Sequence, residues 1–257
     1  MKPESHDSCK LCLQNKKLIK AHIIPEGFFR VLRSGDLAPE LYTNTPGTHP
    51  KRSPVGEYDL SILCSSCDNT LAPWDTYAQD VLLQQLPSAR TIVSQDRTVA
   101  RIIDEFDCQK LKLFFISLLW RASVSTRSFY KRISVGPFEE QLRTMILAGK
   151  PGGPDDFAVF LGRFEDPEVP AMLDPHRQRF EGISFCQFYL AGVVAYIKVD
   201  QRPTPTFWTD FRLRENAALL VVARSLNSKD GKLLRSLAES AMAYKTMKNK
   251  VAKVETE

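Results

Sequence analysis

The sequence predicts an α+β fold in which a cysteine-bearing N-terminal segment, residues 1–86, precedes an α/β body, residues 87–257, with a small, mostly antiparallel sheet and helices. Three observations support this division. Two CxxC pairs and a stretch rich in Gly, Pro, Ser and Thr lie in the first segment. A long apolar run of helical length lies in the second. Runs rich in aromatic and β-branched residues follow it, as is typical of strands.

The helices of the body are predicted from apolar spacing and from end signals. Residues 107–122, DCQKLKLFFISLLWRA, carry an apolar stripe of helical period. In residues 136–150, GPFEEQLRTMILAGK, Pro137 stands near the expected helix start and Gly149 stands where a C-cap is favoured. A last helix is expected over residues 231–248.

The strands of the body are predicted from runs of aromatic and β-branched residues. Residues 157–164, FAVFLGRF, and residues 217–225, AALLVVARS, are each long enough for one strand. Residues 183–199, ISFCQFYLAGVVAYIKV, are long enough for two strands on either side of Ala191 and Gly192. Strands joined by such a short connection pair in the antiparallel direction, which favours a mostly antiparallel sheet.

Composition narrows the class of protein. The 257 residues carry a formal net charge of +5, which suits a nucleic-acid partner without requiring one. The N-terminus is polar from its first residues, so no signal peptide is expected. A membrane-spanning helix needs about 20 apolar residues, and the most apolar run, residues 111–119, is shorter. We therefore expect a cytoplasmic protein that does not enter a membrane.

Four of the six cysteines form two CxxC pairs, namely Cys9, Cys12, Cys64 and Cys67. In a reducing compartment such pairs favour metal binding over disulfides. Two pairs supply four thiolates, which is a complete tetrahedral set for a structural zinc ion. The alternative is four unrelated buried cysteines. Cys108 and Cys186 stand singly within apolar runs, and we expect both to be core thiols.

A lone histidine lies between the two cysteine pairs. Because four sulfur ligands complete a structural zinc site, His22 is free for another role. The surrounding residues 18–25, LIKAHIIP, predict a strand that ends in a turn marked by Pro25. Asp68 directly follows Cys67 and opens an expected helix over residues 68–83. The alternative is that His22 is a structural residue whose polar atoms are satisfied within the fold.

These residues resemble the HNH endonuclease family, the ββα-metal nucleases, in the version braced by a structural zinc between two CxxC pairs. HIIP, beginning at His22, matches the strand that carries the family's general-base histidine. DLSILC places Asp59 where the family usually has asparagine, and Asp68 stands in the position of the third motif residue, usually His or Asn. The resemblance covers about the first third of the chain, and implies a zinc-braced ββα-metal (HNH-like) module over residues 1–86.

The resemblance also implies an activity, metal-dependent DNA endonuclease. His22 would act as the general base, and Asp68, assisted by Asp59 or Asp75, would bind a catalytic Mg²⁺ or Mn²⁺. The downstream sequence resembles the body of bacterial members tied to phage defence, which implies antiviral defence and a protein partner. One departure is Ala21, because many active members carry Asp or His at that position. The alternatives are a catalytically inactive, zinc-dependent nucleic-acid-binding module and a regulatory subunit.

The residues expected to bind DNA are Lys51, Arg52, Arg121, Arg127, Lys131 and Arg132. Residues 120–132, WRASVSTRSFYKR, interleave four of these cations with Trp120, Phe129 and Tyr130, whose rings are candidates for stacking on bases. The Lys51–Arg52 pair is included because, in the family, the loop beside the site often meets the duplex backbone. The alternative is a helix end with a solvated basic rim and core aromatics, together with an ordinary surface loop.

Overall fold

The computed structural model describes residues 8–33, 38–43, 51–165 and 172–225, together with residues 227, 232 and 236. Its α-helices are α1 (Glu26–Arg30), α2 (Ser65–Gln79), α3 (Leu86–Ser88), α4 (Cys108–Val124) and α5 (Glu139–Ala148). A π-helical segment, η1 (Asp80–Gln85), joins α2 to α3. Short 3-10 helices are η2 (Ser128–Tyr130), η3 (Gly136–Phe138) and η4 (Thr206–Phe211).

Twelve strands are present in the described residues. They are β1 (Ala21–His22), β2 (Glu40–Tyr42), β3 (Lys51–Arg52), β4 (Tyr58–Asp59), β5 (Arg90–Ser94), β6 (Arg97–Ile103), β7 (Val159–Phe164), β8 (Met172–Leu173), β9 (His176–Phe180), β10 (Ile183–Leu190), β11 (Val193–Lys198) and β12 (Leu219–Arg224).

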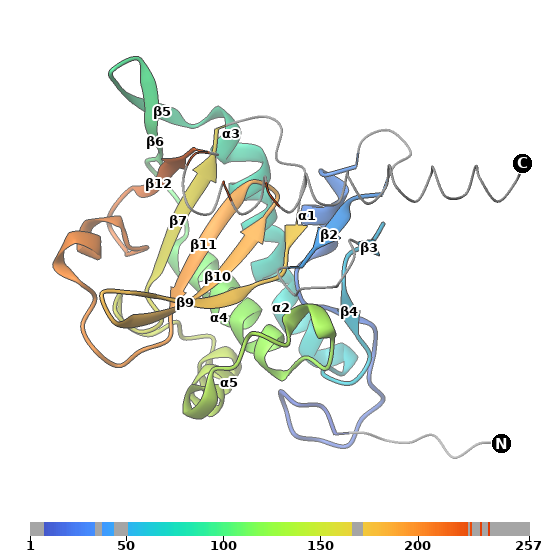
Figure 1. The fold of residues 1–257 in the computed structure, drawn as a ribbon. Coiled ribbons are helices and arrows are strands. Elements are labelled where there is room, and N and C mark those ends of the chain that lie inside the picture. Colours follow the sequence, from blue (N-terminus) through green and yellow to red (C-terminus); the bar gives the residue numbers. More distant parts are fainter. Residues whose placement is uncertain are drawn as a thin grey trace, which may run out of the picture.

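A seven-stranded sheet of order β5-β6-β12-β7-β11-β10-β9 forms the centre of the molecule (Figure 1). All neighbouring strands in it are antiparallel except β12 and β7. The β10–β11 hairpin turns at Ala191 and Gly192, whose φ angles of 51° and 88° are those of a tight two-residue turn. The predicted strands are confirmed, and the sheet is larger than expected because β5, β6 and β9 were not predicted.

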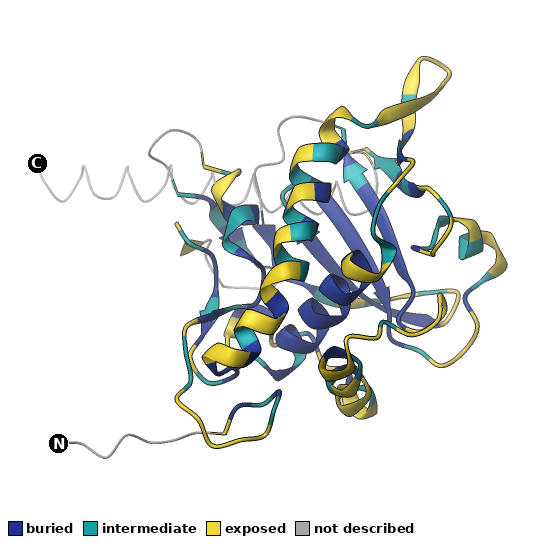
Figure 2. Ribbon diagram, turned by 180° about the vertical axis from the view of Figure 1, so that it is seen from behind, coloured by how far each residue is buried: buried dark blue, intermediate teal, exposed yellow. Residues whose placement is uncertain are grey.

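Both faces of the sheet are covered, and side chains alternate between them. In β11, Val193 and Ala195 belong to the main core, whereas Val194 and Tyr196 belong to a second cluster that packs around Trp208 of η4. On the main-core side, α4 lies between the sheet and α2 and is buried over almost its whole length (Figure 2). Burial on most sides explains why the middle of α4 is largely apolar.

The predicted helices of the body form where their end signals indicate. Asp107 is the N-cap of α4, and its side chain accepts a hydrogen bond from the backbone N–H of Lys110. Helix α5 ends at Gly149, whose left-handed φ of 61° lets its N–H reach the Ile146 carbonyl oxygen. Pro137 lies in η3, the turn that leads into α5.

The N-terminal segment contains a short β-ladder followed by a helix. Strand β1 pairs antiparallel with β4, with Ala21 opposite Asp59 and His22 opposite Tyr58. The strand expected over residues 18–25 is thus limited to two residues, and the helix expected from Asp68 begins earlier, at Ser65. The elements around the candidate site are therefore β1, β4 and α2, with α1, β2 and β3 between β1 and β4 in the chain.

The two predicted segments share one core. Buried side chains from Cys9 to Val221 form a continuous cluster, and β2 of the first segment pairs in parallel with β8 of the second. The helical run α2–η1–α3 continues across residue 86, so the expected boundary does not coincide with a break in packing. Nearly all of the helix expected over residues 231–248 lies outside the described residues. In the part of the chain that the structure describes, no helix combines the length and apolar character needed to cross a membrane.

Candidate metal centre and active site

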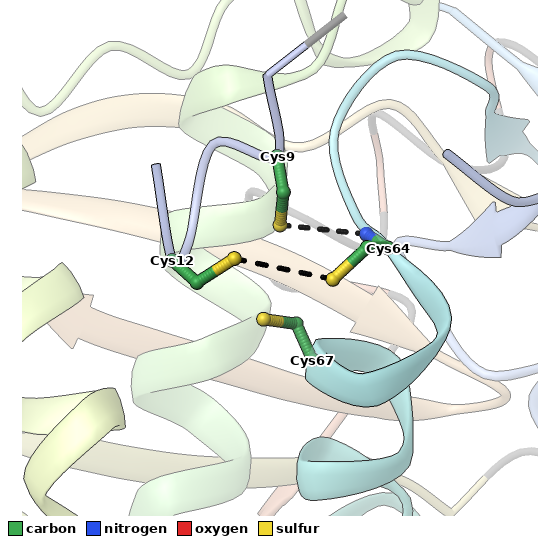
Figure 3. A group of neighbouring side chains, drawn as sticks. All are labelled: Cys9, Cys12, Cys64 and Cys67. Atoms are coloured by element: carbon green, nitrogen blue, oxygen red, sulfur yellow. Dashed lines mark hydrogen bonds between the residues drawn. The ribbon is translucent and has the colours of Figure 1, made fainter. Parts of the chain in front are cut away.

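The two CxxC pairs meet in space. The sulfur atoms of Cys9, Cys12, Cys64 and Cys67 all lie within 4.8 Å of one another and point toward a common centre (Figure 3). Tetrahedral zinc with bonds of about 2.3 Å requires sulfur–sulfur separations of about 3.8 Å. The Cys12 and Cys64 sulfurs are 4.0 Å apart, close to that value. The four cysteines can therefore bind one metal ion, and an all-thiolate tetrahedral set fits zinc.

Local backbone structure orients each cysteine pair toward the metal site. In the first pair, the Leu13 N–H donates to the Cys9 carbonyl oxygen and the chain reverses through Leu13 at a φ of 60°. In the second pair, Cys64 is the N-cap residue of α2 and Cys67 lies in its first turn, so helical geometry places both on one side. Backbone bonding from Ile19 to Leu63 then holds the two loops together.

The environment of Cys64 favours its thiolate. Burial opposes ionisation, but hydrogen bonds from the Ser66 hydroxyl and from Cys67 outweigh it and lower the pKa of Cys64 to about 6. The backbone N–H of Cys64 donates to the Cys9 sulfur at 3.4 Å. Deprotonated sulfur is the form that binds metal, so these donors favour the ligating state.

One ring nitrogen of His22 is hydrogen-bonded to the backbone. Its Nε2 lies 3.0 Å from the carbonyl oxygen of Val55. Because a carbonyl oxygen only accepts hydrogen bonds, Nε2 must carry the proton, and a neutral ring then has its lone pair on Nδ1. Burial is the main cause that lowers the pKa of His22 below its usual value. The ring is therefore neutral near pH 7, with Nδ1 able to accept a proton.

Asp68 lies on α2 and shares an electrostatic environment with His22. It is half-buried, and burial raises its pKa above the usual carboxyl range, while Arg121 and His22 act in the opposite direction. In return the Asp68 charge raises the pKa of His22, so the two groups are close enough to affect each other. Two of the three residues predicted to be catalytic therefore lie within electrostatic range of each other.

Asp59, the third predicted catalytic residue, is enclosed by hydrogen-bond donors. Its Oδ1 accepts from the backbone N–H and hydroxyl of Ser61, and its Oδ2 accepts from Ser125 and from Thr126. Asp59 is only 2% exposed. With both oxygens occupied, its carboxylate holds the loop after β4 against the end of α4, and a role as a cation ligand is not supported.

Asp75 forms an ion pair. Both of its carboxylate oxygens accept from the guanidinium of Arg121, at 2.8 and 2.6 Å. Arg121 is only 1% exposed and also donates to the His22 carbonyl oxygen at 2.9 Å. The expectation that Arg121 contacts DNA phosphates is therefore wrong, because solvent does not reach it. The expectation that Asp75 assists a cation is not supported, because its oxygens already have a cationic partner.

Two other predicted DNA-binding residues come together on Glu57. The Lys51 Nζ donates to Glu57 Oε1 at 3.0 Å, and the Arg127 Nε donates to Glu57 Oε2 at 3.1 Å. The side chains of Lys51 and Arg127 are 64% and 44% exposed, whereas that of Glu57 is 7% exposed. Glu57 immediately precedes Tyr58, which lies opposite His22 in the β1–β4 ladder. These three residues are named the Glu57 cluster below.

The remaining basic residues differ in their setting. Arg52 is exposed and lies 3.7 Å from Glu40. Lys131 is exposed, and Arg132 is partly exposed with its Nε 3.9 Å from Asp174. The aromatic side chains expected to stack on bases are buried instead, and they are Trp120, Phe129 and Tyr130. The stacking prediction is therefore wrong, and the alternative of core aromatics holds for these rings.

Sequence reasoning missed several residues that shape the site. Val55 contacts His22 through its backbone carbonyl, and no side-chain pattern predicts such a contact. Glu57 was not singled out, although an acidic residue beside a predicted strand and near basic residues is a signal of pairing. Ser125 and Thr126 hold Asp59 from 66 and 67 residues away. Cys186 and Cys108 pack in or against the core as expected, and burial raises the pKa of both thiols.

Comparisons with protein-family models, with curated proteins and with solved structures find no significant match to this chain. Function must therefore be inferred from the site itself.

Proposed function

We propose that this protein is a metal-dependent DNA endonuclease in which His22 is the general base, of the HNH-like class that its sequence resembles. The observation that carries the proposal is the state of His22. Its Nε2 proton is donated to the Val55 carbonyl oxygen, its Nδ1 carries the lone pair, and the charge of Asp68 raises its pKa. A neutral imidazole held in one orientation is suited to act as a general base that activates water.

His22 would remove a proton from a water molecule that attacks a phosphodiester phosphorus. The lowered pKa keeps the ring neutral at physiological pH, and the Val55 contact fixes the direction in which Nδ1 points. General-base catalysis of this kind contributes about 10²- to 10⁴-fold in rate. Hydrogen bonding by Val55 also stabilises the imidazolium formed after proton transfer, because its carbonyl faces the charged ring.

Asp68 is the residue that would hold the catalytic cation. A bound Mg²⁺ or Mn²⁺ supplies charge stabilisation to the phosphoryl group and to the leaving oxygen. Mg²⁺ is commonly bound by one or two carboxylates, with water and substrate phosphate completing the shell. In the described residues the only group of three or more closely spaced ligand side chains is the cysteine cluster, so a cation at Asp68 would depend on water and substrate phosphate for most of its ligands.

The cysteine cluster would hold zinc in a structural role. It joins the loop before β1 to the start of α2. His22 lies on β1, and Asp68 lies on α2. Four sulfur ligands leave no open coordination position for substrate. Zinc would therefore fix the relative position of the base and the carboxylate without entering the reaction.

The Glu57 cluster is the part of the surface that would contact the DNA backbone. Lys51 and Arg127 are exposed cations, and Glu57 holds both of them close to the ladder position opposite His22. Cations at such a position neutralise phosphates and release counterions when DNA binds. Arg52, Lys131 and Arg132 would also contact DNA phosphates, because their side chains are exposed or partly exposed.

The experiment that tests the proposal is a plasmid-nicking assay with Mg²⁺, with Mn²⁺ and with EDTA, run on the wild type and on His22→Ala. Metal-dependent nicking that disappears in the variant supports the proposal. Absence of nicking by the wild type with either ion overturns it. The assay should include single-stranded and duplex DNA, because the site does not define the preferred form.

One observation favours a second candidate, a catalytically inactive, zinc-dependent nucleic-acid-binding or regulatory subunit. Position 21 carries a fully buried alanine, and Asp75 is occupied by Arg121. Among the described residues, the carboxylates whose charges act on His22 are then Asp68 and Glu26, and Glu26 is paired with Arg30. DNA binding without nicking, with the salt dependence expected for phosphate contacts, would identify this alternative.

A further inference from the structure

Arg121 links three elements of the candidate site. It lies near the end of α4, where Nη1 and Nη2 each donate to one oxygen of Asp75 on α2. Nη1 also donates to the His22 carbonyl oxygen of β1 at 2.9 Å. The remaining contacts of the guanidinium, from Nε and Nη2, go to the carbonyl oxygen and hydroxyl of Ser117. Every nitrogen of this buried side chain is therefore engaged.

These contacts add a second anchor to His22. The ring is held through Nε2 by Val55, and the backbone carbonyl of the same residue is held by Arg121. Pairing of β1 with β4 involves only two residues on each strand, which is a short ladder for holding a catalytic side chain. The Arg121 contact ties this short ladder to α4, one of the most deeply buried elements of the protein.

The charge of Arg121 is balanced by the carboxylate of Asp75. Because Arg121 donates to both oxygens of Asp75, the two side chains form an ion pair with no net charge. A buried charge requires such a partner. A lysine at this position would keep the charge but cannot make the paired contacts to Asp75 and to His22 in the same geometry.

We propose that the Arg121–Asp75 ion pair is a positioning device for the candidate active site. Arg121 holds the backbone of His22 from α4, and Asp75 fixes the orientation of the guanidinium that does so. Neither residue contacts substrate or cation in this arrangement. The inference rests on the proposed function of His22, and it assigns to both residues a role other than the DNA contact and the cation contact expected from sequence.

The test compares Arg121→Lys with the wild type in nicking kinetics and in imidazole NMR. We expect kcat to fall on the order of 10- to 100-fold with KM for the plasmid little changed, because a misplaced base affects the transition state more than binding. Zinc content should be unchanged. Imidazole ¹⁵N shifts, assigned by their loss in His22→Ala, should report the Nε2–H form in the wild type and a mixture of tautomers in Arg121→Lys.

A matched control separates positioning from general destabilisation. Glu165→Gln removes another partly buried ion pair, in which Arg101 and Glu165 are 2.6 Å apart, away from His22. A loss of kcat in Arg121→Lys that equals the loss in Glu165→Gln overturns the proposal. If Arg121→Lys does not fold, Asp75→Asn serves instead, because it keeps the side-chain volume and removes only the charge that orients Arg121.

The two readouts also keep this inference distinct from the proposed function. If the wild type shows no nicking, the nuclease proposal fails, and the tautomer measurement still decides the positioning role. An unchanged His22 tautomer in both Arg121→Lys and Asp75→Asn overturns that role whether or not the protein is a nuclease. A changed tautomer with unchanged kcat in an active enzyme also overturns it, because the base would then not depend on the pair.

Discussion

Thr126 donates two hydrogen bonds to one carboxylate oxygen of Asp59, from its backbone N–H at 2.7 Å and from its hydroxyl at 2.9 Å. Asp59 lies on β4 opposite Ala21, the residue before His22, whereas Thr126 lies just beyond the end of α4. The contact therefore joins the ladder that carries the candidate base to the body of the protein. Together with Arg121, it makes the end of α4 part of the site.

The enclosed carboxylate of Asp59 predicts a pH dependence of stability. Burial raises its pKa, but hydrogen bonds from Ser61, Thr126 and Ser125 outweigh burial and lower the pKa to about 2. Because the folded-state pKa lies below the unfolded value, the stabilisation is present above about pH 4 and is lost as pH falls toward 2. Asp59→Asn should lower the free energy of unfolding at pH 7 by on the order of 2 kcal/mol.

Urea unfolding at several pH values checks this. The difference between wild type and Asp59→Asn should shrink between about pH 4 and pH 2, since the wild-type carboxylate is then protonated. Asp104→Asn is the control, because Asp104 is 64% exposed and pairs only at the surface with Arg90. A difference for Asp59→Asn that stays constant down to pH 2 would contradict the assignment.

The cysteine cluster predicts about one zinc ion per chain. Cys64→Ser should lower the zinc content and destabilise the region around β1 and α2, because binding free energy at a structural zinc site is also folding free energy. Elemental analysis and thermal unfolding measure both effects. Cys108→Ser is the matched control, since Cys108 lies outside the cluster and should leave zinc unchanged. Freshly purified protein without zinc would contradict this prediction.

The candidate base predicts a separation of catalysis from folding. His22→Ala should abolish nicking while zinc content and DNA affinity remain close to wild type, because a general base acts mainly on the transition state. Asp68→Ala should also abolish nicking through loss of the cation ligand, so excess Mn²⁺ is expected to restore part of its activity. The same excess should not restore His22→Ala. Loss of folding in His22→Ala would instead indicate a structural histidine.

The pH–rate profile gives a further check on His22. The base must be neutral to accept a proton, so activity should rise with pH through the folded-state pKa of His22. Burial lowers that pKa, and the acidic limb of the profile should therefore inflect below 6.5. An inflection above 6.5, at a metal concentration that saturates the site, would indicate that another group controls the rate.

The Glu57 cluster predicts the salt dependence of DNA binding. Lys51→Ala and Arg127→Ala should each weaken binding and reduce the slope of log affinity against log salt by about one unit, if each cation contacts one phosphate. Arg90→Ala is the control, because Arg90 is a similarly exposed, ion-paired arginine on β5. Equal slopes for all three variants and the wild type would remove the cluster from the DNA interface.

Much of the fold was predictable because its signals are local. The paired spacing of the cysteines, the apolar run of α4, the C-cap at Gly149 and the short turn at Ala191–Gly192 each depend on a few neighbouring residues. The β5–β6 hairpin was missed because its turn uses Gln95 and Asp96 at positive φ rather than a glycine. Strand β9 was missed because its sequence, HRQRF, is polar, as befits a strand at the edge of the sheet.

The sequence alone predicted that the two cysteine pairs meet at one metal site, because the spacing within each CxxC pair is local and four thiolates form a complete ligand set. Only the tertiary structure decided the roles of Asp59, Asp75 and Arg121. A carboxylate can bind a cation, accept hydrogen bonds or pair with an arginine, and an arginine can bind phosphate or be buried. Which of these occurs depends on groups 46 to 99 residues away, whose approach is set by the packing of α4 against α2 and the sheet.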